Sequence, residues 1–160
     1  RLENVQSPSK VINLQDNLAA ITCGIFTDCC HLNNWLFDQV ILQNQIFGSE
    51  LLITRLATLL GEYMHHKSLW PLRPFGATII LLGYDPNNGP KIIEIDPIGN
   101  CYDCRYTSIG AGSKDIAKNW DRSKDPTKME LKHLISESLQ LFLKANEDSE
   151  SDFRCQEDEK

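Results

Sequence analysis

Cysteines and histidines are the residues of this 160-residue chain that could bind a metal or act as nucleophile and base. Cys101 and Cys104, two of six cysteines, have the spacing of a zinc knuckle. Four-coordinate zinc needs a second well-spaced pair, which neither Cys29-Cys30 nor His65-His66 provides. A spacing of three along a strand also sends Cys101 and Cys104 to opposite faces. We therefore expect reduced structural thiols, without metal or cofactor, and keep a metal-binding module as the alternative.

The remaining polar residues do not form a catalytic pattern. Gly110-Ala111-Gly112-Ser113 lacks the lysine and the longer glycine spacing of a nucleotide-binding loop, which favours a tight turn and a helix cap. No Ser or Cys stands at motif spacing beside any of the four histidines, which are His31, His65, His66 and His133. The sequence therefore offers no catalytic site that can be named.

Charge and hydropathy exclude two classes of partner. Residues 146–160 carry seven acidic and two basic side chains, which is −5 of the net charge of −6. The rest of the chain is near neutral and has no cluster of Lys and Arg to bind nucleic acid. No apolar run approaches the roughly 20 residues of a membrane-spanning helix, and the N-terminus lacks the layout of a signal peptide. We expect a cytoplasmic and nuclear protein.

The segment 72–113 predicts an antiparallel meander. Residues 77–82 are continuously apolar and rich in branched side chains, which is typical of a central strand covered on both faces. Turn-forming residues occupy 85–90 and 96–100. Between them, 91–96 alternates so that Ile93 and Ile95 share the dry face, and 102–107 alternates as a third strand.

The N-terminal part predicts a hairpin followed by two helices. Residues 9–15 and 18–24 are strand-like and flank the two-residue reversal Asp16-Asn17. Thr27 or Asp28 can cap the first helix, and Gly48-Ser49 separates it from the second. The apolar stripe of the first helix consists of Cys29, Leu32, Trp35, Leu36 and Val40, and that of the second of Leu52, Leu56, Leu59, Leu60 and Tyr63.

Two further helices follow the meander. Gly112-Ser113 begins a short one with Ile116, Ala117 and Trp120, and Asp125-Pro126 begins a longer one, with Asp as cap and Pro at the first helical position. The longer helix is expected to bury Leu131, Leu134, Ile135, Leu139 and Phe142. The apolar signal ends after Ala145, which predicts one folded domain over 1–145 and a disordered acidic tail over 146–160.

Five short motifs occur in a fixed order through the meander. They are Arg73-Pro74-Phe75-Gly76, Gly83-Tyr84-Asp85, Gly89-Pro90, Asp96-Pro97-Ile98-Gly99-Asn100 and Ile109-Gly110-Ala111-Gly112-Ser113. In order and spacing they resemble the run shared by α-type subunits of the proteasome core particle. The hairpin, which closes on Gly24-Ile25-Phe26-Thr27-Asp28, resembles the same family.

The resemblance implies an α+β fold, the four-layer αββα sandwich of the N-terminal-nucleophile hydrolase type, with antiparallel sheets. The order ββ-αα-βββ-αα matches part of that fold and is incomplete at both ends, so the chain reads as a fragment or an eroded member. Its sheets should then have unpaired edges. The link between the first two helices, residues 45–49, is shorter than the connector of the family.

Active members of this fold use an N-terminal Thr, Ser or Cys whose own amine serves as the base. The chain begins at Arg1 and has no such nucleophile. The resemblance therefore implies a non-catalytic, structural α-type subunit of a threonine-type endopeptidase complex. It would take part in ubiquitin-dependent protein degradation within a heteroheptameric α ring stacked on β subunits. The alternative is a catalytic proteasome-like threonine hydrolase whose nucleophile segment is missing from this chain.

The resemblance also assigns candidate site residues. Lys10 matches the lysine that lines pockets between neighbouring α subunits, where the C-terminal carboxylates of activators bind, and an ammonium group suits such a carboxylate. A solvated lysine at a strand edge is the alternative. The structural motif consists of Arg73, Pro74, Phe75, Gly76, Asp96, Pro97, Gly99, Gly110 and Gly112, with Phe75 expected to be buried beneath the turn that leads into the central strand.

Overall fold

The computed structural model describes residues 10–69, 71–86, 88–121 and 124–157, without the side chains of 147–157. The chain divides into two compact units, one ending at Cys104 and one beginning at Arg105. The sequence predicts one folded domain over 1–145, whereas the structure divides this range between Cys104 and Arg105.

The first unit is built on a five-stranded antiparallel sheet in the order β1-β2-β3-β4-β5. Its strands are β1 (Val11–Gln15), β2 (Leu18–Gly24), β3 (Ala77–Asp85), β4 (Gly89–Ile95) and β5 (Cys101–Cys104). Every neighbouring pair is antiparallel, which confirms the predicted hairpin and meander. The central position of β3 agrees with its continuous apolar sequence, whereas β1 and β5 are the outer strands.

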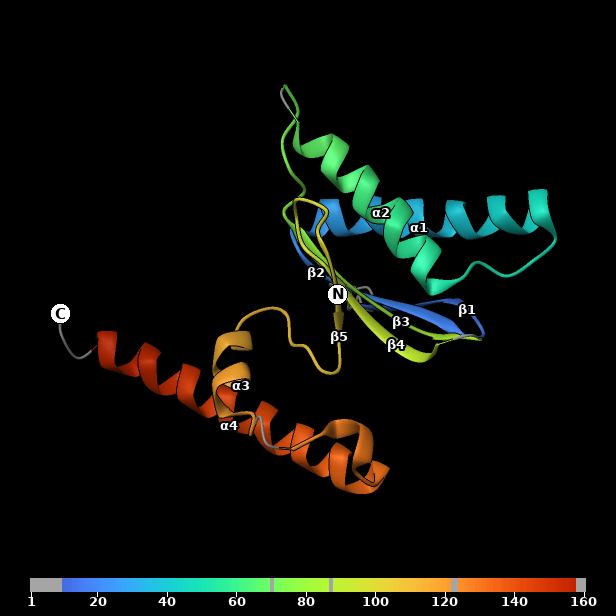
Figure 1. Cartoon of the computed structure of the whole chain (residues 1–160). Coiled ribbons are helices and arrows are strands. Elements are labelled where there is room, and N and C mark those ends of the chain that lie inside the picture. Colours follow the sequence, from blue (N-terminus) through green and yellow to red (C-terminus); the bar gives the residue numbers. More distant parts are fainter. Residues whose placement is uncertain (1–9, 70, 87, 122–123, 158–160) are drawn as a thin grey trace, which may run out of the picture. The chain divides into compact units, whose positions relative to one another are not determined.

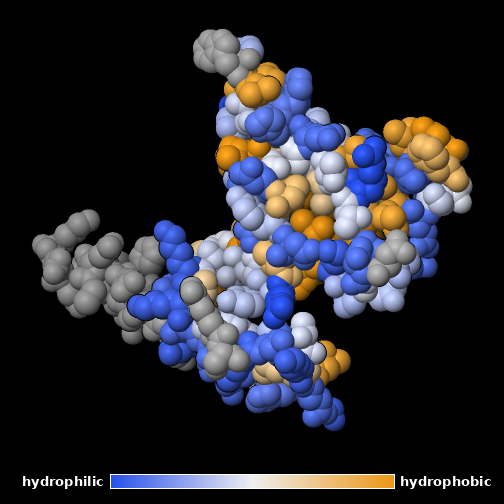
Figure 2. All heavy atoms as spheres, viewed as in Figure 1, coloured by the Kyte–Doolittle hydropathy of each residue, from blue (hydrophilic) through white to orange (hydrophobic). Residues whose placement is uncertain are grey.

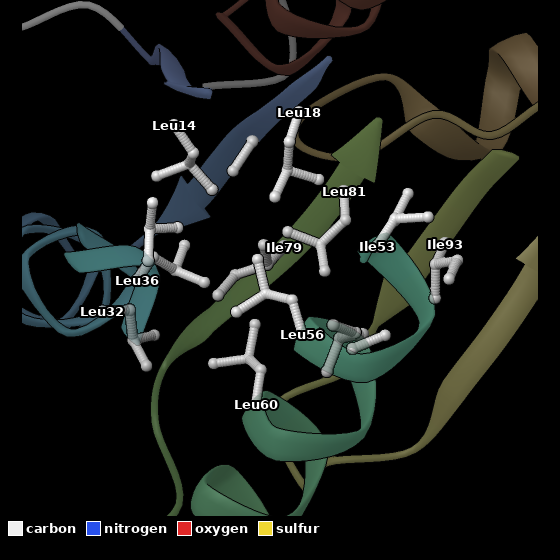
Figure 3. Packing of buried hydrophobic residues seen from close by; sticks show 14 of the residues in the cluster. Leu14, Leu18, Leu32, Leu36, Ile53, Leu56, Leu60, Ile79, Leu81 and Ile93 are labelled. Carbon is white, nitrogen blue, oxygen red and sulfur yellow. The ribbon is translucent and has the colours of Figure 1, made fainter. Parts of the chain in front are cut away.

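Helices α1 (Phe26–Phe47) and α2 (Ile53–Ser68) cover one face of this sheet (Figure 1). The core lies between them and the sheet, where Leu32 and Leu36 of α1 and Leu56 and Leu60 of α2 face β3 (Figure 3). The predicted stripe of α1 is confirmed, since all its members are buried except Trp35, which is partly buried against the core. In α2, Ile53 and Met64 are fully buried while Leu52 is exposed, because the helix starts one residue after Leu52.

The opposite face of the sheet is also apolar. The strand register places Ile21, Ile80, Leu82 and Ile92 there, since residues on this face alternate with those that point at α1 and α2. Within the described residues of the first unit, helices lie on one face only. An α+β fold with an antiparallel sheet is therefore present, and the second sheet of a four-layer sandwich stays a prediction.

The second unit contains α3 (Ser113–Asn119), the 3₁₀ turn η1 (Pro126–Lys128) and α4 (Leu131–Glu157). Trp120 is buried at the end of α3, and its ring lies 4.9 Å from that of Tyr106. Asp125 caps η1 by accepting a hydrogen bond from the backbone N–H of Thr127 at 3.2 Å. The predicted cap is therefore present, but the turn that it starts ends after three residues and α4 begins separately.

Two expectations for α4 differ from the structure. Four residues that were expected to be buried are 50–68% exposed, namely Leu131, Ile135, Leu139 and Phe142. An apolar stripe predicts which side of a helix can be buried, but burial also needs a second surface. The helix also continues to Glu157, through most of the predicted disordered tail. The segment contains glutamates, which have a high helix propensity. The prediction of disorder rested on hydropathy and did not take this propensity into account.

No helix in the described part of the chain combines the length and the apolar character needed to cross a membrane.

Candidate functional site

Arg73 and Asp28 fasten the loop before β3 to the first turn of α1. The Arg73 guanidinium donates from Nη1 to Oδ2 and from Nη2 to Oδ1 of Asp28, both at 2.8 Å. The backbone N–H of Gly76 donates to the same Oδ2 at 2.8 Å, and the N–H of Ile25 donates to the Gly76 carbonyl at 2.7 Å. The residues 73–76 of the structural motif thus hold two segments of backbone together.

The predicted capping role of Thr27 or Asp28 is wrong. The N-cap residue of α1 is Ile25, which makes no side-chain cap, and the Asp28 oxygens are taken by Arg73 and Gly76. These hydrogen bonds from Arg73 and Gly76 lower the pKa of the Asp28 carboxyl from 3.8 to about 2. Local sequence could not reveal this, because the partners lie 45 and 48 residues away.

Gly24 and Gly76 allow the two backbones to cross in contact. A Cβ atom at Gly24 would lie 2.1 Å from the Gly76 carbonyl oxygen, and Gly24 has a φ of +146°. A Cβ at Gly76 would lie 2.4 Å from Cδ1 of Ile25. Gly24 is therefore required by the close approach of two backbones, whereas a side chain at Gly76 would displace the exposed side chain of Ile25. The motif that ends at Asp28 meets the Arg-Pro-Phe-Gly motif at this crossing.

Phe75 belongs to an aromatic cluster that joins the loop to both helices. Its ring centroid lies 5.7 Å from that of His31 in α1 and 5.7 Å from that of Tyr63 in α2. Tyr63 also stacks on Trp35 at 4.7 Å, and its hydroxyl is 2.7 Å from Nε2 of His31. Phe75 packs against the core but is only partly buried, which corrects the expectation of a buried side chain.

Asp96 organises the turn between β4 and β5. Its Oδ1 accepts from the N–H groups of Ile98 (3.0 Å) and Asn100 (2.9 Å), and its Oδ2 from the Asn100 side chain (2.9 Å). Partial burial raises the pKa of Asp96, but the hydrogen bonds from Asn100 and Ile98 outweigh it and hold this pKa below its ordinary value. Pro97 lies inside the turn, which is therefore fixed from within.

Gly99 brings this turn against the backbone of α2. Gly99 has a φ of +93°, and a Cβ there would lie 2.2 Å from the carbonyl oxygen of Gly61. A Cβ at Gly61 would in turn lie 2.7 Å from the Gly99 carbonyl oxygen. Gly61 was not among the residues predicted from the sequence. A glycine inside an apolar helix pattern, where alanine is favoured, is the signal that could have found it.

Gly110 and Gly112 form a separate turn in the second unit. Their φ angles are +100° and +79°, and the N–H of Ser113 donates to the Gly110 carbonyl at 3.2 Å. Gly112 is the N-cap residue of α3, so this segment starts a helix as expected.

Cys101 and Cys104 lie on opposite faces of the sheet, as their spacing predicts. Cys101 pairs with Ile95 and its thiol contacts the Ala57 carbonyl of α2 at 3.3 Å, whereas Cys104 pairs with Ile92 on the other face. Partial burial raises the pKa of both thiols. Among the residues that the structure describes, no three His, Cys, Asp or Glu side chains gather as metal ligands.

Lys10 lies at the start of β1 and is exposed. Its carbonyl accepts a hydrogen bond from the N–H of Thr22 at 3.1 Å, which pairs it with the end of β2. Its ammonium group has no hydrogen-bond or ion-pair partner within the described segments. Lys10 does not join the contacts around Arg73.

Comparison with known proteins gives one family. A family model described as Proteasome subunit matches residues 3–156. Proteasome subunit alpha type-1 of Drosophila melanogaster is 27% identical over 127 residues, which are 76% of this chain and 45% of that protein. Proteasome subunit alpha of Methanocaldococcus jannaschii is 30% identical over 120 residues, 70% of this chain and 43% of that protein. Proteasome subunit alpha type-6 of Saccharomyces cerevisiae is 26% identical over 117 residues, 72% of this chain and 50% of that protein.

The fold and the contacts of the motif residues agree with this match, and the chain belongs to the proteasome subunit family. Within the family, its similarity is to the α-type subunits of eukaryotes and archaea. The chain spans about half the length of these relatives.

Proposed function

We propose that this chain is a non-catalytic, structural α-type subunit of the proteasome core particle, in the ring that gates and docks activators in ubiquitin-dependent protein degradation. The match over residues 3–156 to the proteasome subunit family carries this proposal. The motif residues support it, because Arg73, Asp96 and Gly99 are engaged in holding loops and not in presenting a reactive group. The subunit then contributes to a threonine-type endopeptidase complex without a nucleophile of its own.

A catalytic, proteasome-like threonine hydrolase is the alternative. We do not favour it, since the relatives compared above are all named α subunits. A threonine-directed covalent inhibitor separates the two functions. The proposal expects no labelling of this chain, and stoichiometric labelling would establish the hydrolase.

The proposed partners are other α subunits, in a heteroheptameric ring, and β subunits. One surface that supports such contacts is the α1 end patch, which we define as the exposed residues Ile41, Leu42, Ile46 and Phe47. Figure 2 shows hydrophobic residues gathered at this end of α1. Residues 39–49 contain no charged side chain, and charge depletion is typical of the centre of a protein interface.

The finer fold that we propose is the four-layer αββα sandwich of the N-terminal-nucleophile type. The apolar face of the sheet opposite α1 and α2 supports it, because Ile21, Leu82 and Ile92 stand on a face that no helix of the first unit covers. A second sheet packed there would bury them. The exposed apolar side of α4 would likewise be buried in the complete fold.

Lys10 is proposed to line the pocket that receives the terminal carboxylates of activators. Its exposure supports this role, as does the lack of an ion-pair partner for its ammonium group among the residues that the structure describes. The proposed location is cytoplasmic and nuclear, as follows from the proposed complex.

Affinity purification of the tagged protein, co-expressed with α and β subunits of its own organism, tests the proposal. We expect stoichiometric recovery of both kinds of subunit. Ile46→Asp should reduce recovery at least about tenfold, since it places a charge in an apolar contact. Asn34→Asp adds the same charge to an exposed position of α1 outside the uncharged stretch and should leave recovery unchanged. Recovery of the wild-type protein without proteasome subunits would contradict the proposal.

A further inference from the structure

A cavity of about 380 Å³ opens beside the Arg73 junction. Thr27 and His31 line it from α1, Lys67 from the end of α2, and Leu72, Arg73 and Phe75 from the loop before β3. Lys10 is not part of its wall. The volume lies within the range of small-molecule sites, so the chemistry of the wall decides what it could hold.

The charges of the wall favour an anion. The Asp28 side chain is 9% exposed and that of Arg73 is 65% exposed, so the negative partner of this ion pair is shielded and the positive partner faces solvent. Lys67 adds a second cation, whose Nζ lies 5.6 Å from the centre of the Tyr63 ring. Within the described part of the chain, no carboxylate lies at ion-pair distance from Lys67. The cavity therefore has an excess of positive charge.

The geometry of Arg73 favours a carboxylate. A guanidinium has five N–H donors, of which three are engaged here: two with Asp28 and one with the Pro74 carbonyl at 3.0 Å. The remaining donors, on Nε and Nη2, form one edge of the group and have no acceptor among the described residues. Two parallel N–H groups on one edge match the two oxygens of a carboxylate.

The rest of the wall favours a ligand with an apolar part. Phe75 stacks on His31 and contacts the tilted ring of Tyr63, so it forms a fixed aromatic surface, and Leu72 extends that surface. We propose that this cavity binds a carboxylate attached to an apolar group. The carboxylate meets the free edge of Arg73 and the Lys67 ammonium, and the apolar group lies against Phe75 and Leu72. This site goes beyond the proposed subunit role and does not rest on it.

Saturation-transfer NMR of the full protein with benzoate tests the site. Benzamide has the same ring without the charge, and inorganic phosphate has the charge without the ring. We expect saturable benzoate binding with a millimolar dissociation constant and benzamide binding at least about tenfold weaker. Inorganic phosphate has no carbon-bound proton to observe, so it is added as a competitor and should displace benzoate only at a concentration at least about tenfold higher. Equal binding of benzamide, or full competition by phosphate at the same concentration, would overturn the proposal.

Variants locate the binding. Lys67→Met keeps the aliphatic stem and removes the charge, and should weaken benzoate binding about tenfold. Thr27→Val, which removes a hydroxyl from the wall, is a second variant should Lys67→Met fold poorly, and it should weaken binding by a smaller factor. Lys132→Met, at an exposed lysine of α4, should not change it. Unchanged affinity in folded Lys67→Met and Thr27→Val protein would place benzoate elsewhere and refute the site.

A capped peptide distinguishes the source of the carboxylate. If acetyl-Phe-Glu-Phe-amide binds more tightly than benzoate and its Gln analogue does not bind, the ligand is an acidic side chain of a protein. If benzoate binds and the peptide does not, the ligand is a small organic acid. Failure of both probes to bind contradicts the proposal.

Discussion

Asp28 is the residue on which the junction between α1 and the loop before β3 depends most. Its two oxygens accept three hydrogen bonds, from Arg73 and from the backbone of Gly76. The carboxylate is shielded while the guanidinium is largely exposed. Loss of the Asp28 carboxylate would therefore release the loop from α1 and leave the backbone N–H of Gly76 without an acceptor.

Asp28→Asn should lower the free energy of unfolding by about 2 kcal/mol, the usual size of lost hydrogen bonds to a charged group. Urea unfolding followed by circular dichroism measures this. Asp38→Asn, at an exposed acid of the same helix, is the control and should change it by less than about 0.5 kcal/mol. Equal effects of the two substitutions would show that the junction does not contribute to stability.

The lowered pKa of Asp28 predicts a pH dependence. A carboxyl whose pKa is depressed in the folded state stabilises the protein fully above its unfolded pKa, and this stabilisation is lost as pH falls toward the folded pKa. For Asp28 that window runs from 3.8 down to about 2. The pKa values of Asp96 and Asp125 are also lowered, so they add to the loss in acid. Unfolding free energies measured against pH should therefore fall less steeply in Asp28→Asn than in the wild type, and parallel curves would contradict the assignment.

At the level of the secondary-structure elements, the contact between α2 and the turn before β5 depends on Gly61 and Gly99, because neither residue has a side chain. Gly99→Ala should cost about 3 kcal/mol or more, because it combines a positive φ with overlap on the Gly61 carbonyl. Gly89→Ala is the matched control, since Gly89 also has a positive φ of +77° but has open space around it. It should cost only the backbone strain, about 1–2 kcal/mol. Thermal or urea unfolding of the two variants checks the difference, and similar losses would exclude the close approach as its cause.

Helix α4 allows a second test of an element. Leu139 is 57% exposed, so Leu139→Gln should change the unfolding free energy of the chain by less than about 0.5 kcal/mol. Leu60→Ala, in the fully buried stripe of α2, should cost about 3 kcal/mol. A loss above about 2 kcal/mol for Leu139→Gln, measured on the chain alone, would mean that its side chain is buried in solution.

These elements also show what the sequence could and could not predict. The hairpin and the meander were predictable, because turn residues bound their strands and residues 77–82 are continuously apolar. The pairing of β2 with β3, which joins them into one sheet, was not predicted, and the third strand of the meander ends at Cys104, before the predicted end at residue 107. The burial of Leu32, Leu36 and Val40 followed from helical spacing. The Arg73–Asp28 pair and the Gly61–Gly99 contact were not predictable, since each joins residues 38 or more positions apart through geometry that no local pattern carries. The exposure of Leu139 was missed because a stripe does not specify what covers it.

For the whole molecule, two features agree with the proposed role as a subunit. In the first unit, α1 and α2 cover one face of the sheet, the opposite face is also apolar, and the α1 end patch is uncharged and exposed. Surfaces of this kind are typical of chains that function in an assembly. We therefore propose that the protein acts by association with other proteasome subunits and not through chemistry of its own.

Native mass spectrometry of the protein, alone and mixed with α and β subunits of its own organism, tests this claim most directly. We expect the protein to appear in ring-sized complexes with those subunits. We also expect a threonine-directed inhibitor to add mass to the β subunits and not to this chain. A stable monomer that ignores the partner subunits, or an inhibitor adduct on this chain, would contradict it.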